Sequence, residues 1–168
     1  MPTMLHDLAV WLHASDLALQ IREDDLLFPM IESLHVLCIT LVVGSIMVVD
    51  LRLLGLASTR RSITEITGTI LPMTWVAFAI AVIAGGLLFI SNAVEYSENG
   101  FFIAKMLLMA LAGANMLAFH FLLSGDIARW NGWKSPPLAA RLSGGLSLGL
   151  WVAIVACGRW IGFTMPGS

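Results

Sequence analysis

Hydrophobic residues along this chain fall into four long, nearly uninterrupted runs separated by short polar segments. The runs cover residues 28–54, 69–92, 100–124 and 138–163. Each is longer than the roughly 20 residues that an α-helix needs to cross about 30 Å of hydrocarbon at ~1.5 Å per residue. Because these runs are apolar around the whole helix, they are typical of membrane spans. The pattern predicts an all-α integral membrane protein, with a four-helix bundle over residues 27–168.

The first 26 residues follow a different pattern, in which apolar and ionisable side chains alternate. Leucines and Trp11 are interrupted by His6, Asp7, His13 and Asp16. Such a segment is too polar to span a membrane and predicts an amphipathic helix, over Met4–Ile21, that lies in the interface. A disordered tail is the alternative.

The composition agrees with a membrane protein. Of the 168 residues, 58% are hydrophobic and 12% are charged, whereas soluble domains carry about 25% charged residues. The net charge of −2 gives no indication of nucleic-acid binding. Cys38 and Cys157 both lie inside apolar runs, which predicts two separate buried thiols rather than a disulfide.

Basic residues gather in two of the three connections between the runs. These residues are Arg60 and Arg61 after the first run, with Arg52 at its end, and Arg129 and Lys134 after the third run, with Arg141 at the start of the fourth. The connection over residues 93–99 has two glutamates and no basic residue. Because Lys and Arg favour the cytoplasmic side, we expect a multi-pass protein of a bacterial inner membrane. Both termini are then periplasmic.

This orientation converts sequence position into depth, and one layer near the periplasmic side collects polar groups and glycines. His35 is expected roughly 10 Å below the outer surface at the helical rise. The layer contains Glu32, His35, Gly85, Gly86, Lys105 and Arg159. Ionisable side chains in a membrane cost about 2.5–3.5 kcal/mol each on insertion scales, and they commonly mark a pathway or a ligand. The alternatives are a structural Glu32–Lys105 ion pair and a histidine that only packs.

A second polar layer is expected near the cytoplasmic side, formed by Asp50, Asn115 and His120. Asp50 and His120 have comparable depth, so they either form a carboxylate–histidine pair or reach the headgroups separately. Asn115 is deeper and is expected to hydrogen-bond across helices. Met109 follows Lys105 by one turn; it either packs or offers a thioether to copper(I) or haem iron.

Two segments carry a resemblance to known proteins: LHVLCITLVVGSIMVVDLRLLG (residues 34–55) and FFIAKMLLMALAGANMLAFH (residues 101–120). They resemble a widespread family of small four-helix bacterial inner-membrane proteins of unassigned function. More remotely, they are similar to the membrane-type protoporphyrinogen oxidases and the copper-resistance D family. The resemblance implies that His35 is an axial ligand of a b-type haem, with Lys105 nearby and essential. The tryptophan and tyrosine that follow the oxidase histidine are absent here, so porphyrinogen oxidation is less strongly implied than haem binding.

A haem b would suit the outer layer. Neutral His35 could ligate the iron, and its other ring nitrogen would then need a hydrogen-bond acceptor. Gly85 and Gly86 would leave room for the ring, while Arg159 and Arg22 could pair with the propionates. Met106, Met109, Lys105 and an open position are all candidates for the opposing side of the iron.

These observations lead to three functional hypotheses. The first is a b-type haem protein that transfers electrons between quinone and a periplasmic redox partner, or catalyses a haem-dependent oxidation. The second is a proton- or copper-linked transporter in which Glu32, His35 and Lys105 bind the transported ion. The third is a non-catalytic assembly subunit. In any of them, the small-xxx-small pattern Gly145–Gly149 would allow a homodimer in the bilayer.

Overall fold

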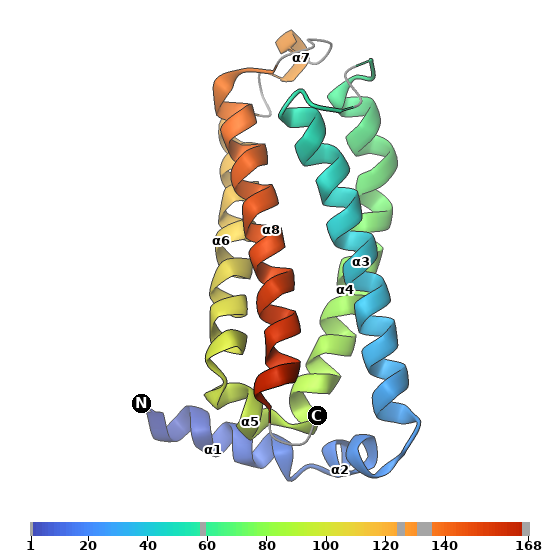
Figure 1. Ribbon diagram of the computed structural model, residues 1–168, viewed down its shortest axis with the longest axis vertical. Helices are drawn as coiled ribbons and strands as arrows, with labels where there is room; N and C mark the ends of the chain where they lie inside the picture. The colour runs from blue at the N-terminus through green and yellow to red at the C-terminus, as the bar shows by residue number, and fades with distance from the viewer. Residues whose placement is uncertain (1, 58–59, 124–126, 131–135, 166–168) are drawn as a thin grey trace.

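The computed structural model describes residues 2–57, 60–123, 127–130 and 136–165, which form eight helices and no strand (Figure 1). Four of these helices are long and apolar enough to cross a membrane. The protein is therefore an all-α integral membrane four-helix bundle with short helices at its two ends. The helices are α1 (Pro2–His13), α2 (Asp16–Glu23), α3 (Leu27–Leu53), α4 (Ile63–Ser91), α5 (Ala93–Glu98), α6 (Gly100–Leu123), α7 (Ile127–Trp130) and α8 (Leu138–Thr164).

The four long helices confirm the four predicted spans, and one of them is longer than expected. α4 begins at Ile63 rather than near Thr69. Its first turn is stabilised by Ser62, whose hydroxyl accepts a hydrogen bond from the backbone N–H of Glu65 at 3.2 Å. A serine followed three residues later by a glutamate is a common helix start. The polar residues of this turn lie outside the hydrophobic run, so hydropathy alone did not include them.

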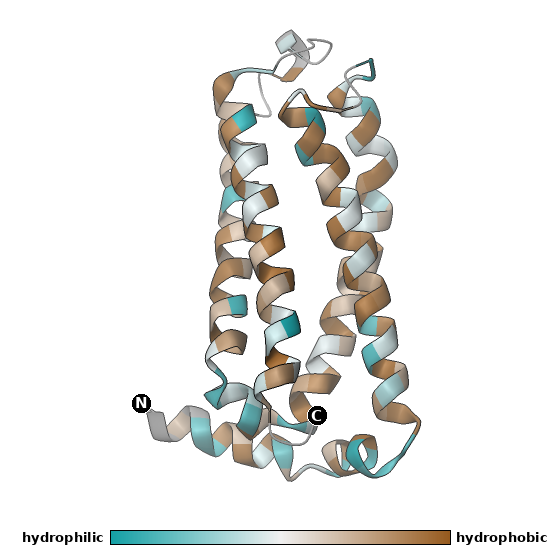
Figure 2. Ribbon diagram, viewed as in Figure 1, coloured by the Kyte–Doolittle hydropathy of each residue, from teal (hydrophilic) through white to brown (hydrophobic). Residues whose placement is uncertain are grey.

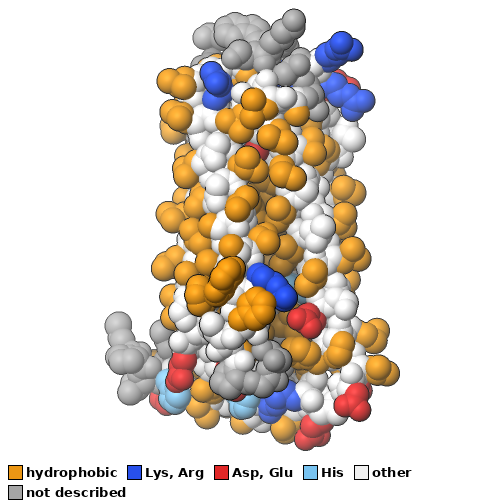
Figure 3. Space-filling view, in the orientation of Figure 1, with side chains coloured by type: hydrophobic (Ala, Val, Ile, Leu, Met, Phe, Trp, Pro, Cys, Tyr) orange, Lys and Arg blue, Asp and Glu red, His pale blue; other side chains and the backbone are white. Residues whose placement is uncertain are grey.

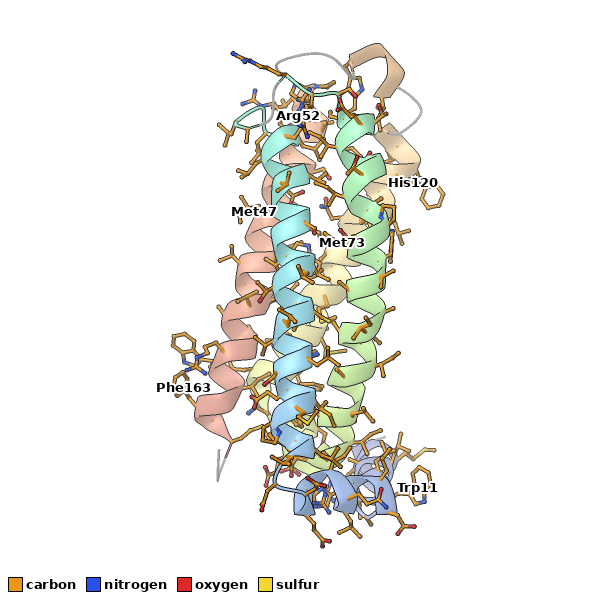
Figure 4. All side chains as sticks on the ribbon, turned by 90° about the vertical axis from the view of Figure 1, so that its right-hand side faces the viewer. Trp11, Met47, Arg52, Met73, His120 and Phe163 are labelled. Carbon is orange, nitrogen blue, oxygen red and sulfur yellow. The ribbon has the colours of Figure 1, made fainter. Side chains whose placement is uncertain are left out.

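The N-terminal segment forms two short helices where one was predicted. Ser15 ends the first helix and caps the second, because its hydroxyl accepts from the N–H of Ala18 at 3.3 Å. Both helices lie across one end of the bundle, and Trp11, which is 69% exposed, points away from it (Figure 4). Arg22 attaches the segment to α4 by donating hydrogen bonds to the carbonyl oxygens of Ser91 and His13.

The two termini lie at the same end of the bundle, together with α1, α2 and α5 (Figure 1). We call this the terminal end. α7 and the connection between α3 and α4 lie at the opposite end, which we call the α7 end. The long helices pack as two pairs, α3 on α4 and α6 on α8, and α3 with α8 makes the main contact between the pairs. Three buried alanines, Ala77, Ala81 and Ala84, allow α4 to pack closely.

The surface of the bundle suits a lipid environment. Hydrophobic residues cover the long helices, and hydrophilic ones are more frequent in the segments at the ends (Figure 2). On the face shown in Figure 3, hydrophobic side chains run along the middle and charged side chains gather towards the ends. Large apolar side chains such as Val36, Leu107 and Val152 are well exposed in the isolated chain. A bilayer removes the cost of that exposure, because lipid tails take the place of water.

Candidate functional site

His35 is a residue of α3 whose half-buried side chain faces α4. Its Nδ1 atom is 2.8 Å from the carbonyl oxygen of Ala81. A carbonyl oxygen only accepts hydrogen bonds, so Nδ1 carries the proton when the imidazole is neutral. The lone pair then resides on Nε2. A backbone carbonyl is one of the acceptors that commonly bind one ring nitrogen of a histidine whose other nitrogen binds a metal.

Gly85 makes this approach possible. It lies one turn after Ala81, and a Cβ atom at its position would be 2.7 Å from Cε1 of His35 and 3.2 Å from Nδ1. Any side chain at this position would therefore push the imidazole away. Gly86 behaves differently, because a Cβ atom there would have nothing within 4 Å. Of the predicted glycine pair, only the first residue contacts the histidine.

Lys105 reaches into the bundle from α6. Its Nζ atom lies 3.8 Å from the position that a Cβ atom would take at Gly158 on α8. The ammonium acts electrostatically on His35 across the bundle, and it lies close to Cys157. Within the part of the chain that the structure describes, no hydrogen bond or ion pair engages Nζ.

The four residues occupy one layer of the bundle. His35 lies eight residues after the start of α3, and Lys105 lies five after the start of α6. Gly85 and Gly158 each lie six residues before the ends of α4 and α8. At ~1.5 Å per residue, all four lie about 8–12 Å inside the terminal end. We call this set the histidine layer.

An aromatic cluster lies between this layer and the terminal end. The rings of Phe89 and Phe102 are stacked with centroids 5.4 Å apart. Tyr96 of α5 lies 5.4 Å from the ring of Phe102 and 6.2 Å from that of Phe89. The cluster joins α4 to α6, two helices that otherwise make little contact. Sequence reasoning missed it because its three members come from three different helices.

Tyr96 also shows where Glu32 lies. Burial raises the pKa of the Tyr96 phenol above its ordinary value of 10.0, and the charges of Glu32 and Glu95 raise it further. Glu32 lines a shallow hollow on the surface of α3. Among the described residues it forms no ion pair with Lys105, so the structural pair considered as an alternative is absent.

Arg159 has the depth of the histidine layer but is exposed, whereas Arg22 and Met109 lie at other depths. Arg159 is exposed, and its guanidinium lies 4.7 Å from the centre of the Phe163 ring. Arg22 is engaged by Ser91 and His13 at the end of α4. Met109 is half-buried on α6, one turn beyond Lys105.

Of the two alternatives given for Asp50 and His120, the carboxylate–histidine pair does not fit their positions, because Asp50 is buried and His120 is exposed. Asp50 is buried, and its carboxyl forms a side-chain hydrogen bond with Ser147 of α8. His120 lies on the outside of the bundle (Figure 4), where its ring lies edge-to-face against Phe121. The two residues have similar depth but lie on different faces of their helices. Sequence reasoning missed Ser147, because a serine inside an apolar run carries no strong signal.

Asn115 bonds across helices, as its depth suggested. Its Nδ2 atom donates to the carbonyl oxygen of Ser143 at 3.1 Å, and the Ser143 hydroxyl donates to Oδ1 at 3.1 Å. Both bonds join α6 to α8. This reciprocal arrangement satisfies the amide and fixes the register of that helix pair, so a structural role accounts for the residue.

Within residues 2–57, 60–123, 127–130 and 136–165, no group of three or more His, Cys, Asp or Glu side chains is placed to hold a metal ion. The histidine layer therefore supplies one imidazole nitrogen, with an amine and a thiol nearby. A haem suits this donor set, because the porphyrin brings four nitrogen ligands and needs only one or two from the protein.

The fold and these contacts define a small four-span helical membrane protein whose described residues place one histidine between the helices of the bundle. The chain belongs to the family of unknown function DUF6644, which matches residues 25–164. The match covers all four spans and begins after α2. Neither curated proteins nor solved structures give a match.

Proposed function

We propose that this protein is a membrane b-type haem protein that transfers electrons near the terminal end, with His35 as an axial ligand. The observation that carries the proposal is the 2.8 Å contact between Nδ1 of His35 and the carbonyl oxygen of Ala81. This contact fixes the orientation of the ring and leaves the lone pair of Nε2 free to bind iron. A bound haem would supply a one-electron redox centre.

Three other residues have supporting roles in the proposal. Gly85 leaves space for the imidazole because it has no side chain. Lys105 supplies a positive charge that favours anionic groups, and it is placed on the helix pair opposite His35. Arg159 follows Gly158 on α8 and is exposed, so it is available to a propionate close to the interface.

The proposal includes an orientation. The Arg residues of the α3–α4 connection lie at the α7 end, which the positive-inside rule assigns to the cytoplasm. The terminal end is then periplasmic in a bacterial inner membrane, where quinone or a periplasmic redox protein would be the partner. Reporter fusions at Ser97 and Arg61 test this orientation. They should report opposite sides, with Ser97 outside; fusions that report the same side contradict it.

Haem binding is tested by the visible spectrum of protein expressed with ample haem. Wild type should show a Soret band that shifts on reduction, and His35→Ala should lose it while the bundle stays inserted. His120→Ala is the matched control. It also removes a histidine near the end of a span, but this one lies on the outside of the bundle. It should keep the spectrum. Wild type without haem, or His35→Ala with a full complement of it, overturns the proposal.

The transporter hypothesis keeps one observation in its favour, namely that Lys105 carries an amine inside the bundle without a hydrogen bond among the described residues. Copper would need ligands besides His35, and Cys157 and Met109 are sulfur-bearing residues close along the chain to this layer. Metal analysis of the same purified protein separates the two functions. Copper in a stoichiometric amount, without haem, favours transport; neither group favours the assembly subunit.

A further inference from the structure

Asp50 is the most deeply buried carboxyl group among the described residues, with 4% of its surface exposed. It lies on α3 near the α7 end and faces α8. Its Oδ2 atom has no hydrogen-bond partner in the described part of the chain. The Ser147 hydroxyl is its side-chain hydrogen-bond partner. A carboxylate accepts several hydrogen bonds when ionised, so one hydroxyl leaves the charged form poorly solvated.

No cation among the described residues compensates Asp50. Arg52 lies two residues further along the same helix, on a different face, and its Nε donates to the carbonyl oxygen of Arg61 at 3.0 Å. On the neighbouring helices, the charged residues nearest this end are Glu65 of α4 and Arg141 of α8, and both are exposed. Burial and the Ser147 hydrogen bond are therefore the two influences on whether the Asp50 carboxyl group is protonated.

The packing around Asp50 is tight and apolar. A Cβ atom at Gly144 would lie 2.9 Å from Cβ of Leu53 and 3.1 Å from the backbone oxygen of Asp50, so α3 and α8 touch at this point. Leu53 belongs to a buried cluster with Ile63, Trp130 and Ala140. This cluster lies at the α7 end, next to the turn of α3 that carries Asp50.

We infer that Asp50 and Ser147 form a proton-binding site inside the membrane, in which Asp50 holds a proton as a neutral carboxylic acid at neutral pH. The proton is taken from water at the α7 end and returned there, and no bond other than O–H forms or breaks. A calcium ion is a poor occupant, because it needs at least six oxygen ligands and the described residues offer one carboxyl and one hydroxyl here. The inference does not depend on haem.

Infrared difference spectroscopy tests the site on the full chain in lipid vesicles. A protonated carboxylic acid has a C=O stretching band that a carboxylate lacks. Wild type should show this band at neutral pH, and Asp50→Asn should abolish it. Asp25→Asn removes an exposed carboxyl between α2 and α3 and should leave the band intact. Ser147→Ala should shift the band, because it removes the hydrogen bond to the acid.

The outcomes separate the inference from its competitors. No acid band in wild type, or a band that persists in Asp50→Asn, overturns it. Loss of the band on adding sodium at fixed pH would show a cation site instead, and also overturns it. Asparagine has nearly the shape of the neutral acid, so the variant should fold. If it does not, the Ser147→Ala spectrum decides, since a band that stays unmoved there is not Asp50.

Discussion

The contact between His35 and Gly85 makes a sharp mutational prediction. In Gly85→Ala, the new Cβ would be 2.7 Å from Cε1 of His35, whereas carbon atoms in contact prefer about 3.5–4.0 Å. The imidazole must therefore move by about 1 Å. Its Nδ1–H now lies 2.8 Å from the Ala81 oxygen, and such a movement takes the bond beyond the usual limit of about 3.2 Å.

The size of the effect follows from three contributions. Overpacking costs about 1–3 kcal/mol, and a buried donor left without its acceptor costs about 1–3 kcal/mol. Alanine gains about 1 kcal/mol over glycine inside a helix. Because His35 is only half-buried, part of the lost hydrogen bond can be recovered. We expect Gly85→Ala to lower the free energy of unfolding by about 1–3 kcal/mol.

Gly86→Ala is the matched control, since a Cβ atom there meets nothing within 4 Å. It should be neutral or stabilising, by up to about 1 kcal/mol. Unfolding of the purified protein in micelles with increasing amounts of a denaturing detergent measures both variants. In a His35→Ala background the space is free, and the penalty of Gly85→Ala should disappear. Equal effects of the two glycine variants, or a penalty that survives in that background, would refute the contact.

Three further predictions concern other contacts. Gly144→Ala should destabilise the protein by about 1–3 kcal/mol in the same assay, because its Cβ would be 2.9 Å from a side chain of α3; Gly145→Ala, whose nearest atom would be 3.6 Å away, should not. Tyr96 is the only tyrosine, so the alkaline rise in tyrosinate absorbance should come above pH 10.0 and move lower in Glu32→Gln. Its raised pKa means that the folded state keeps the proton longer than the unfolded state, so stability should fall as the pH rises past 10.0 and towards this raised pKa. Arg22→Gln should release α1 and α2 from α4 and make the N-terminal segment easier to cleave in limited proteolysis.

The sequence predicted the spans well because their signal is local. A run of about twenty apolar residues is long enough to cross the hydrocarbon core and too apolar for most positions in a soluble domain. The four runs accordingly match α3, α4, α6 and α8 closely. The start of α4 was missed because capping by Ser62 depends on one hydroxyl rather than on hydropathy. The break between α1 and α2 was missed for the same reason, since Ser15 makes a local hydrogen bond that hydropathy does not report.

The candidate site was predicted less completely, because depth fixes the height of a residue and not the direction of its side chain. His35, Gly85 and Lys105 share a layer, as the helical rise implied. His120 follows Asn115 by five residues, which turns it by about 140° around the helix axis. Asn115 faces α8, so His120 faces away from it. Direction depends on how the helices pack, and a single sequence does not report that packing.

Residues of α3 contact two glycines on other helices. These are Gly85 of α4, towards the terminal end, and Gly144 of α8, towards the α7 end. The residues that touch them, His35 and Asp50, are 15 positions apart, or about 22 Å along the helix. Penalties at sites so far apart normally add within about 0.5 kcal/mol. We therefore expect the Gly85→Ala and Gly144→Ala penalties to be additive in the detergent-unfolding assay. A double variant that differs from the sum by more than this would mean that α3 shifts as one rigid body, so that a change at Asp50 would be felt at His35.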